Sequence, residues 1–177
     1  MPSVFDISPY ISVHQVKTEQ EMAECMKIRF ETFVDEQGFD AKIEEDDPPT
    51  TTTTTTTTSP ISTPSKETDS SLLAQLQGFP LKRTVIGTLR VFAENKDTGH
   101  IGRVAISKQF RGLGIGKILI NSAEVLVKKH APQYKKMLIQ SQYDKVDFYL
   151  KCGYVKKGEA YIVEDVLHQD VIKTLLL

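Results

Sequence analysis

Residues 101–121, IGRVAISKQFRGLGIGKILIN, decide how this chain is expected to fold. The run Gly102–Ile106 is apolar and rich in β-branched residues, which is typical of a buried strand. Arg111–Gly116 then has a glycine at every second position, and Lys117–Lys128 continues with apolar residues at helical spacing. In the order strand, glycine turn and helix, backbone N–H groups and the positive end of a helix dipole converge on one anion. The stretch therefore predicts a phosphate or pyrophosphate site.

The glycine loop matches neither of the two commonest phosphate-binding motifs. A dinucleotide fingerprint that starts at Gly112 needs a glycine where Lys117 stands. A P-loop that ends at Gly116 and Lys117 needs a glycine in place of Arg111 and a Ser or Thr in place of Ile118. An ordinary glycine-rich turn between a strand and a helix is the plain alternative.

The bulk properties of the chain indicate one globular domain. Its 177 residues are 40% hydrophobic and 25% charged, and the net charge of −1 gives no reason to expect nucleic acid as a partner. No apolar run approaches the roughly 18–20 residues of a membrane span, and the first residues do not resemble a signal peptide. We therefore expect a cytoplasmic protein, with the nucleus possible. In that reducing setting Cys25 and Cys152 are best interpreted as small apolar side chains, and no metal site is expected.

The remaining pattern predicts a mixed α/β fold. Residues 10–16 alternate as a half-buried strand does, and Thr18 and Glu21 form a capping box that opens a helix. Further strands are predicted at residues 71–76, 83–92, 137–140, 154–155, 160–163 and 166–175, with a short helix at 145–151. We expect one domain over residues 1–177, with a largely antiparallel sheet of six to seven strands flanked by helices.

Residues 48–70 interrupt this pattern. Two prolines lead into nine consecutive threonines, Thr50 to Thr58, and then into a segment rich in Ser, Thr and Pro. Such a segment has too little apolar surface to offset the entropy of ordering it. Because the part before it supplies only one strand and one helix, we predict a disordered insertion within a single domain, not a linker between two domains.

The glycine loop, read with its neighbours, resembles a known family. R-G-L-G-I-G directly after the strand V-A-I resembles the acetyl-CoA pyrophosphate loop of the GCN5-related N-acetyltransferases (GNAT), whose pattern is Q/R-x-x-G-x-G/A. The stretch QSQYDKVDFYLKCGY at 140–154 is similar to the family's F-Y-x-x-x-G-F/Y motif. FVDEQGF at 33–39, TLRVF at 88–92 and GEAYIVEDVLH at 158–168 resemble the ElaA-type subgroup most closely, although Val166 stands where that subgroup usually has glycine.

The resemblance implies an N-acetyltransferase that uses acetyl-CoA as co-substrate and transfers the acetyl group directly to a primary amine of a small molecule or peptide. It also implies that the fourth and fifth strands part at a bulge and that the pantetheine arm lies between them. Tyr149 would protonate the leaving thiolate or hydrogen-bond to it. The implied cofactor-binding residues are Val104, Ala105 and Ile106 toward the pantetheine, and Arg111, Gly112, Leu113, Gly114, Ile115, Gly116 and Lys117 toward the pyrophosphate.

The acceptor side is less defined by the sequence. Residues 35–47 hold seven acidic side chains against Lys42, and most are interpreted as a solvated loop, with Glu36 facing the substrate. Arg90 either anchors a substrate carboxylate or pairs with the acidic loop, and both interpretations stay open. His168 is the third expected substrate-binding residue. The candidates for a general base are Glu36, Glu159, Glu164, Asp165 and His168, and none is assigned.

Two other functions compete with acetyl transfer. The first is a non-catalytic module of the same fold that binds acyl-CoA, against which the presence of Tyr149 argues. The second is a nucleotide-binding protein that uses the glycine loop for ATP, which the failed P-loop spacing disfavours. A monomer or a homodimer is expected.

Overall fold

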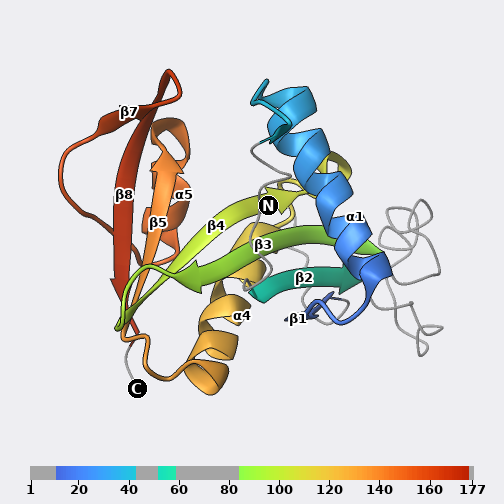
Figure 1. Cartoon of the computed structure of the whole chain (residues 1–177), viewed down its shortest axis with the longest axis horizontal. Helices are drawn as coiled ribbons and strands as arrows, with labels where there is room; N and C mark the ends of the chain where they lie inside the picture. The colour runs from blue at the N-terminus through green and yellow to red at the C-terminus, as the bar shows by residue number, and fades with distance from the viewer. Residues whose placement is uncertain (1–10, 43–51, 59–83, 176–177) are drawn as a thin grey trace, which may run out of the picture.

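The computed structural model describes residues 11–42, 52–58 and 84–175. Its centre is one eight-stranded sheet in the order β1-β2-β3-β4-β5-β8-β6, with β7 paired to β8 (Figure 1). All neighbouring strands are antiparallel except β4 and β5. This confirms the predicted mixed fold with a largely antiparallel sheet. The strands are β1 Ile11–Gln15, β2 Thr52–Thr58, β3 Val85–Ala93, β4 Thr98–Ile106, β5 Lys136–Gln142, β6 Val155–Lys156, β7 Tyr161–Val163 and β8 Val166–Thr174.

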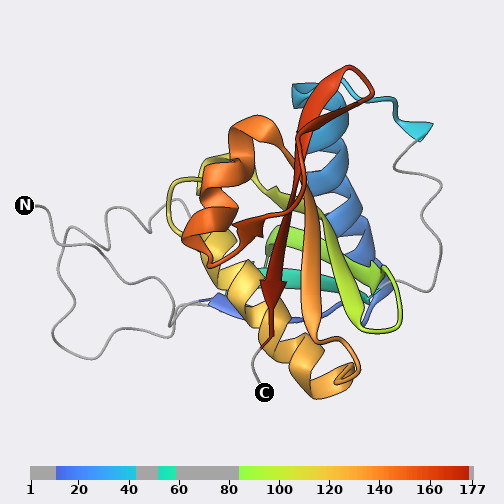
Figure 2. The same cartoon turned by 90° about the vertical axis from the view of Figure 1, so that its left-hand side faces the viewer.

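Helices cover both faces of the sheet. Helix α1 lies on one face, and α4 and α5 lie on the other (Figures 1 and 2). The predicted capping box is present, because Thr18 accepts from the backbone of Glu21 and the Glu21 side chain accepts from the backbone of Thr18. Among the described residues, none of the helices is long and apolar enough to cross a bilayer. The helical segments are α1 Glu19–Arg29, η2 Phe30–Glu36, η3 Lys108–Phe110, α4 Ile115–His130, η4 Tyr143–Lys145 and α5 Val146–Lys151.

The sheet separates two apolar clusters. On the α4 face, Leu89 and Ile101 pack with Leu119 and Ile120 in the larger core. On the α1 face, Cys25 and Ile28 pack with Val85 and Ala105. Both free cysteines are buried, as expected for small apolar side chains. The two clusters hold β3 and β4 rigidly between α1 and α4, and these strands carry much of the candidate site.

The first helix changes its winding before it ends. Residues Phe30–Glu36 form a π-helix, η2, which continues directly from α1 and is followed by Gly38 with a φ of 77°. The capping box predicted where this helix starts, and that start is confirmed, but the change to π winding was not predicted. A π segment is uncommon, and such segments are found frequently at functional sites.

The threonine segment differs from the prediction. Residues 48–70 were expected to be disordered, but Thr52–Thr58 form β2, which pairs with both β1 and β3. Threonine is β-branched and suits a strand, and the neighbouring strands supply backbone hydrogen bonds that a composition argument does not count. The rest of 48–70, the whole strand predicted at 71–76 and the first residue of the strand predicted at 83–92 lie outside the described residues.

Candidate active site

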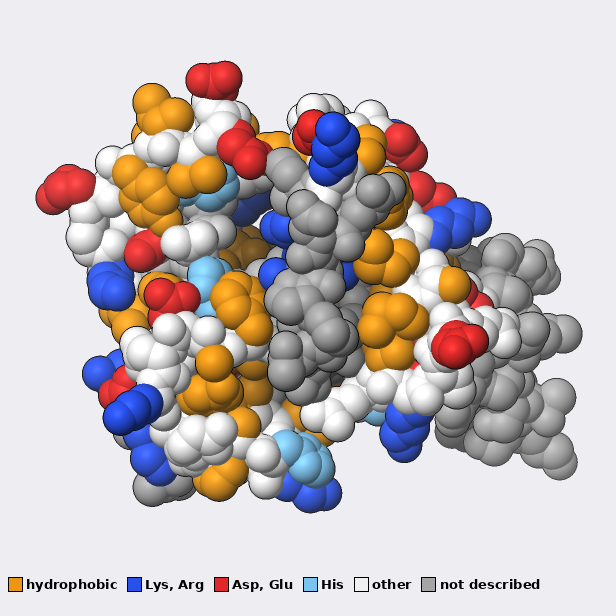
Figure 3. Space-filling view, viewed as in Figure 1, with side chains coloured by type: hydrophobic (Ala, Val, Ile, Leu, Met, Phe, Trp, Pro, Cys, Tyr) orange, Lys and Arg blue, Asp and Glu red, His pale blue; other side chains and the backbone are white. Residues whose placement is uncertain are grey.

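A cavity of about 920 Å³ lies where β4 and β5 part. The two strands pair only through Thr98–His100 and Lys136–Leu138, although β4 has nine residues and β5 has seven. Beyond these three pairs they diverge, so the edge of β4 after His100 no longer pairs with β5. The divergence that the resemblance implied is confirmed. Figure 3, which is viewed from the same side as Figure 1, shows a hollow in the surface of the molecule.

The glycine loop lines one end of the cavity. Gly112 and Gly114 have φ values of 80° and 78°, and a Cβ built at either position would meet no atom within 4 Å. The backbone at these two glycines is therefore in the left-handed region and has open space beside it, so that a ligand can approach it closely. Gly114 is the N-cap of α4 and has no side chain with which to cap the helix. The first turn of α4 contains Lys117 and no acidic residue, which is the arrangement expected beside a bound anion.

Gly116 has a different role in the loop. A Cβ at this position would lie 3.1 Å from the ring of Phe148, which is closer than ordinary van der Waals contact. Phe148 belongs to α5, and its ring stands edge-on to Tyr149, with 4.9 Å between the ring centroids. The absence of a side chain at Gly116 thus lets α5 pack close to the start of α4, which places Tyr149 near the loop.

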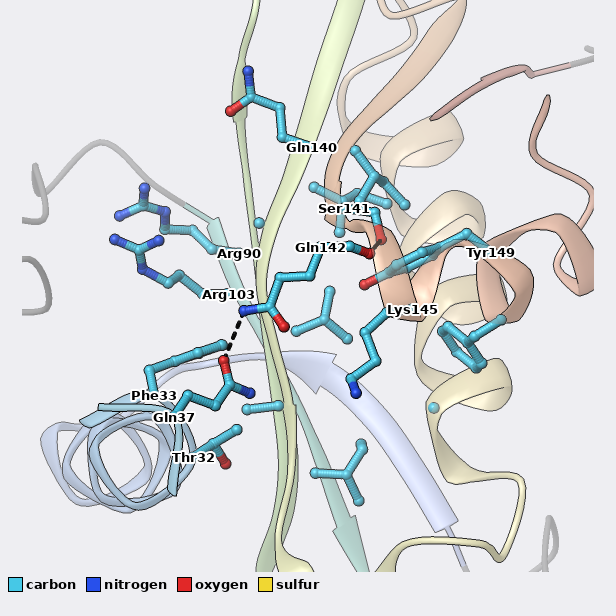
Figure 4. A pocket seen from close by; sticks show the side chains of 18 of the residues that line it. Thr32, Phe33, Gln37, Arg90, Arg103, Gln140, Ser141, Gln142, Lys145 and Tyr149 are labelled. Carbon is cyan, nitrogen blue, oxygen red and sulfur yellow. Dashed lines mark hydrogen bonds between the residues drawn. The ribbon is translucent and has the colours of Figure 1, made fainter. Parts of the chain in front are cut away.

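Tyr149 reaches from α5 toward the end of β5, near Ser141 and Gln142 (Figure 4). The side chain lines the cavity and is 8% exposed. Burial raises the pKa of its hydroxyl well above the ordinary value, with a smaller contribution from Cys152. The hydroxyl therefore stays protonated at neutral pH and is available as a donor.

A β-bulge in β4 brings two arginines together. The register between β3 and β4 shifts between Thr88 and Arg90, and Arg103 has a φ of 53°. Residues four apart in a regular strand share a face, yet Ile101 packs on the α4 side and Ala105 on the α1 side. The bulge thus inverts the alternation of β4. As a result, Arg103 lies beside Arg90 at the cavity (Figure 4).

Arg90 is also held by an aromatic stack. Its guanidinium carbon lies 4.9 Å from the centre of the Phe92 ring. Phe92 stacks on His100, with 4.4 Å between the centroids, and the His100 Nδ1 lies 2.9 Å from a carboxylate oxygen of Glu94. This stack fixes one side of the guanidinium on the cavity wall, and both interpretations of Arg90 given by the sequence stay open.

Arg111 and Glu36 form a two-point ion pair. The Nη1 and Nη2 atoms of Arg111 donate to the two carboxylate oxygens of Glu36 at 2.6 and 3.0 Å. The Nε of Arg111 donates to the carbonyl of Ile106 at 2.8 Å, and Nη2 also lies 3.3 Å from the hydroxyl of Thr32. The Arg111 side chain lowers the pKa of the Glu36 carboxyl below its ordinary value. The guanidinium is therefore directed at η2, not into the glycine loop.

His168 lies on β8 and lines the cavity. Its Nδ1 lies 2.9 Å from the carbonyl oxygen of Val166. Because a carbonyl only accepts, Nδ1 carries a proton, and in the neutral ring Nε2 has the free lone pair. Before His168, the strands β7 and β8 are joined by a two-residue turn in which Glu164 and Asp165 have φ values of 47° and 62°. This turn places Glu164 at the cavity as well.

The structure gathers nearly all of the residues singled out from the sequence around this cavity. Every predicted cofactor-binding residue lines it except Leu113, which is 44% exposed. Tyr149, Glu36, Arg90 and His168 line it too. Four further residues, Gln37, Arg103, Gln142 and Lys145, line the cavity and were not predicted as site residues. Gln37 directly follows η2, Arg103 lies at the bulge, Gln142 ends β5 and Lys145 ends η4.

Comparisons with known proteins identify the family of the chain. A family model described as an acetyltransferase (GNAT) domain matches residues 70–175, more than half of the chain. A Bacillus subtilis (strain 168) protein named as an acetyltransferase is 27% identical over 164 residues, which span 89% of this chain and 92% of the relative. The chain therefore belongs to the GNAT acetyltransferase family.

Solved structures agree in fold. A protein of Lactobacillus plantarum described as an N-acetyltransferase has a TM-score of 0.75 and 21% identity, and the match covers 94% of this chain and 99% of that one. ElaA of Escherichia coli has a TM-score of 0.67 and 16% identity, over 92% and 99%. A GNAT acetyltransferase of Elizabethkingia anophelis with acetyl-CoA bound has a TM-score of 0.61 and 13% identity, over 94% and 99%. The resemblance to ElaA found in the sequence is thus accompanied by likeness of fold.

Proposed function

We propose that this protein is an acetyl-CoA-dependent N-acetyltransferase that transfers an acetyl group directly to a primary amine of a small molecule or peptide. One observation carries the proposal: a single cavity joins the parted strands β4 and β5, the open glycine loop and the buried hydroxyl of Tyr149. The family membership and the relative solved with acetyl-CoA support the same cofactor.

The donor site has two parts. The backbone of Gly112–Gly116 and the first turn of α4 would hold the pyrophosphate, with Lys117 adding charge. Val104, Ala105 and Ile106 lie on the part of β4 that does not pair with β5, and their backbone groups would pair with an extended ligand. Acetyl-CoA supplies the activated acetyl group as a thioester.

The proposed reaction needs one proton donor and one proton acceptor. The amine nitrogen forms a bond to the acetyl carbon, the carbon–sulfur bond breaks, and its electron pair leaves with the sulfur. Tyr149 donates its hydroxyl hydrogen toward that sulfur, a role for which its protonated state suits it. The amine must lose its extra proton before it attacks, and we assign Nε2 of His168, which has the lone pair in the neutral ring, to take it. The second proton leaves the nitrogen once the carbon–nitrogen bond has formed and restores the hydroxyl of Tyr149.

The proposal is tested by measuring CoA release in the steady state against a panel of primary amines, with mass spectrometry of the products. We expect at least one amine class to release CoA and yield the matching N-acetyl product in equal amount. If acetyl-CoA binds but no amine on the panel is acetylated, the protein is a non-catalytic acyl-CoA-binding module of the same fold.

A further inference from the structure

The last residue of the π-helix η2 and the residue that follows it contact the two walls of the cleft. Glu36 binds Arg111, which lies just before the glycine loop on the β4 side. Gln37 accepts a hydrogen bond of 2.8 Å from the side-chain amide of Gln142, the last residue of β5 (Figure 4). Since β4 and β5 pair only at their first residues, these two side-chain contacts join the walls where the backbone does not.

The connection between Arg111 and η2 has little freedom. The guanidinium is fixed by the Glu36 carboxylate at two points and by the Ile106 carbonyl at a third. A bidentate guanidinium–carboxylate pair fixes direction as well as distance, which a single ammonium contact does not. A change in the position of the loop after Arg111 must therefore move η2 or break this pair.

We propose that Glu36 is a positioning residue that couples the donor site to the acceptor side of the cleft through Arg111. When the pyrophosphate of CoA orders the glycine loop, the ion pair orders η2, and Gln37 extends this order to the end of β5. This inference rests on the proposed donor site. It assigns Glu36 and Arg111 to each other, in place of direct contacts with the acceptor and the phosphate.

Hydrogen–deuterium exchange with CoA as the probe tests the coupling. In the wild-type protein, saturating CoA is expected to slow amide exchange in residues 30–37 by at least about fivefold. Arg111→Lys keeps the positive charge beside the loop but cannot bind a carboxylate at two points as a guanidinium does. Glu36→Gln removes the negative charge that Arg111 binds. Both variants are expected to lose the CoA-dependent slowing at 30–37 when each is measured at a CoA concentration that calorimetry shows to saturate it.

A matched control keeps the result specific. Glu31 lies in the same π-helix and, among the described residues, makes an exposed contact of 3.8 Å with Lys27, so Glu31→Gln is expected to keep the full effect of CoA. Slowing at 30–37 that persists in Arg111→Lys and Glu36→Gln, or that is missing in wild-type protein with CoA bound, overturns the inference. Failure of CoA to bind the wild type at all overturns the proposed donor site instead, so the two failures are distinguishable.

Discussion

Arg111 and Glu36, which are 75 positions apart in the sequence, meet through two hydrogen bonds of 2.6 and 3.0 Å. This pair connects the residue that opens the glycine loop with the end of the π-helix. The sequence alone suggested a phosphate ligand at one of these positions and a substrate ligand at the other. Their contact in the folded chain indicates that both side chains shape the cleft at its edge by binding each other.

The ion pair should make part of the stability depend on pH. Arg111 lowers the pKa of Glu36 below the ordinary 4.5, so the folded state favours the ionised carboxylate. The contribution is therefore fully present above pH 4.5 and is lost as the pH falls through the lowered value. In thermal melts at pH 7 the Tm of the wild type should exceed that of Glu36→Gln by at most about 3 °C. This difference in Tm should disappear in acid. A gap that stays constant down to about pH 3 would contradict this assignment.

Tyr149 should matter for turnover and not for cofactor affinity. Tyr149→Phe removes only the hydroxyl and keeps the packing against Phe148. We expect kcat to fall roughly ten- to a hundredfold with little change in the dissociation constant of acetyl-CoA. Tyr143→Phe, at an exposed tyrosine two residues after Ser141, is the matched control and should leave kcat unchanged. Equal kcat values in wild type and Tyr149→Phe would remove Tyr149 from the mechanism.

His168 should affect the acetylation of ammonium substrates. His168→Gln keeps a polar side chain on β8 but supplies no base, so kcat/KM for the amine should fall by at least about tenfold. Raising the pH should recover part of the loss, because more of the amine is then already deprotonated. His130→Gln, at the far end of α4, should behave as the wild type. A loss of activity in His168→Gln that is the same at every pH would indicate a structural role only.

Behind the site, a buried ion pair fastens α4 to β8. The Nζ of Lys173 lies 2.7 and 2.9 Å from the carboxylate oxygens of Glu124 and donates to the carbonyl of Cys152 at 2.9 Å. Glu124 is 8% exposed, so Glu124→Gln leaves a charge without its partner and should lower the free energy of unfolding by about 2–3 kcal/mol.

Denaturant unfolding of matched variants checks this stability prediction. Glu31→Gln, which breaks an exposed contact with Lys27, should cost less than about 0.5 kcal/mol. The double variant Glu124→Gln/Lys173→Met should lose less free energy of unfolding than the sum of the losses in its two single variants. With both charges removed, no unpaired charge is left at the site. Strict additivity would show that the pair is not coupled.

The parts of the fold that depend on neighbouring residues could be predicted from the sequence. The capping box at Thr18 and Glu21 and the strand–glycine–helix order around Gly114 are both local patterns. Tyr149 was predicted through a motif spanning one strand and one helix, and the structure places it at the cavity. Its catalytic role stays a prediction.

The features that the sequence could not supply depend on distant partners. Whether Arg103 faces the core or the cavity is decided by a bulge against β3, and the alternation within β4 alone suggests the wrong face. The pairing of Arg111 with Glu36 and of Gln37 with Gln142 needs the fold to bring η2 to the cleft. The strand β2 was missed because repeated threonine has no apolar pattern, and its neighbours β1 and β3 provide the pairing.

The donor site at the glycine loop is the central claim, and acetyl-CoA titration by calorimetry tests it most directly. Wild type should bind acetyl-CoA with a micromolar dissociation constant, and Gly114→Asp should not bind measurably, because its carboxylate would enter the open loop and repel the pyrophosphate. Gly158→Asp is the matched control, since Gly158 also has a positive φ and open space around it, and it should bind as the wild type does. Equal affinity of Gly114→Asp and the wild type for acetyl-CoA would contradict the account.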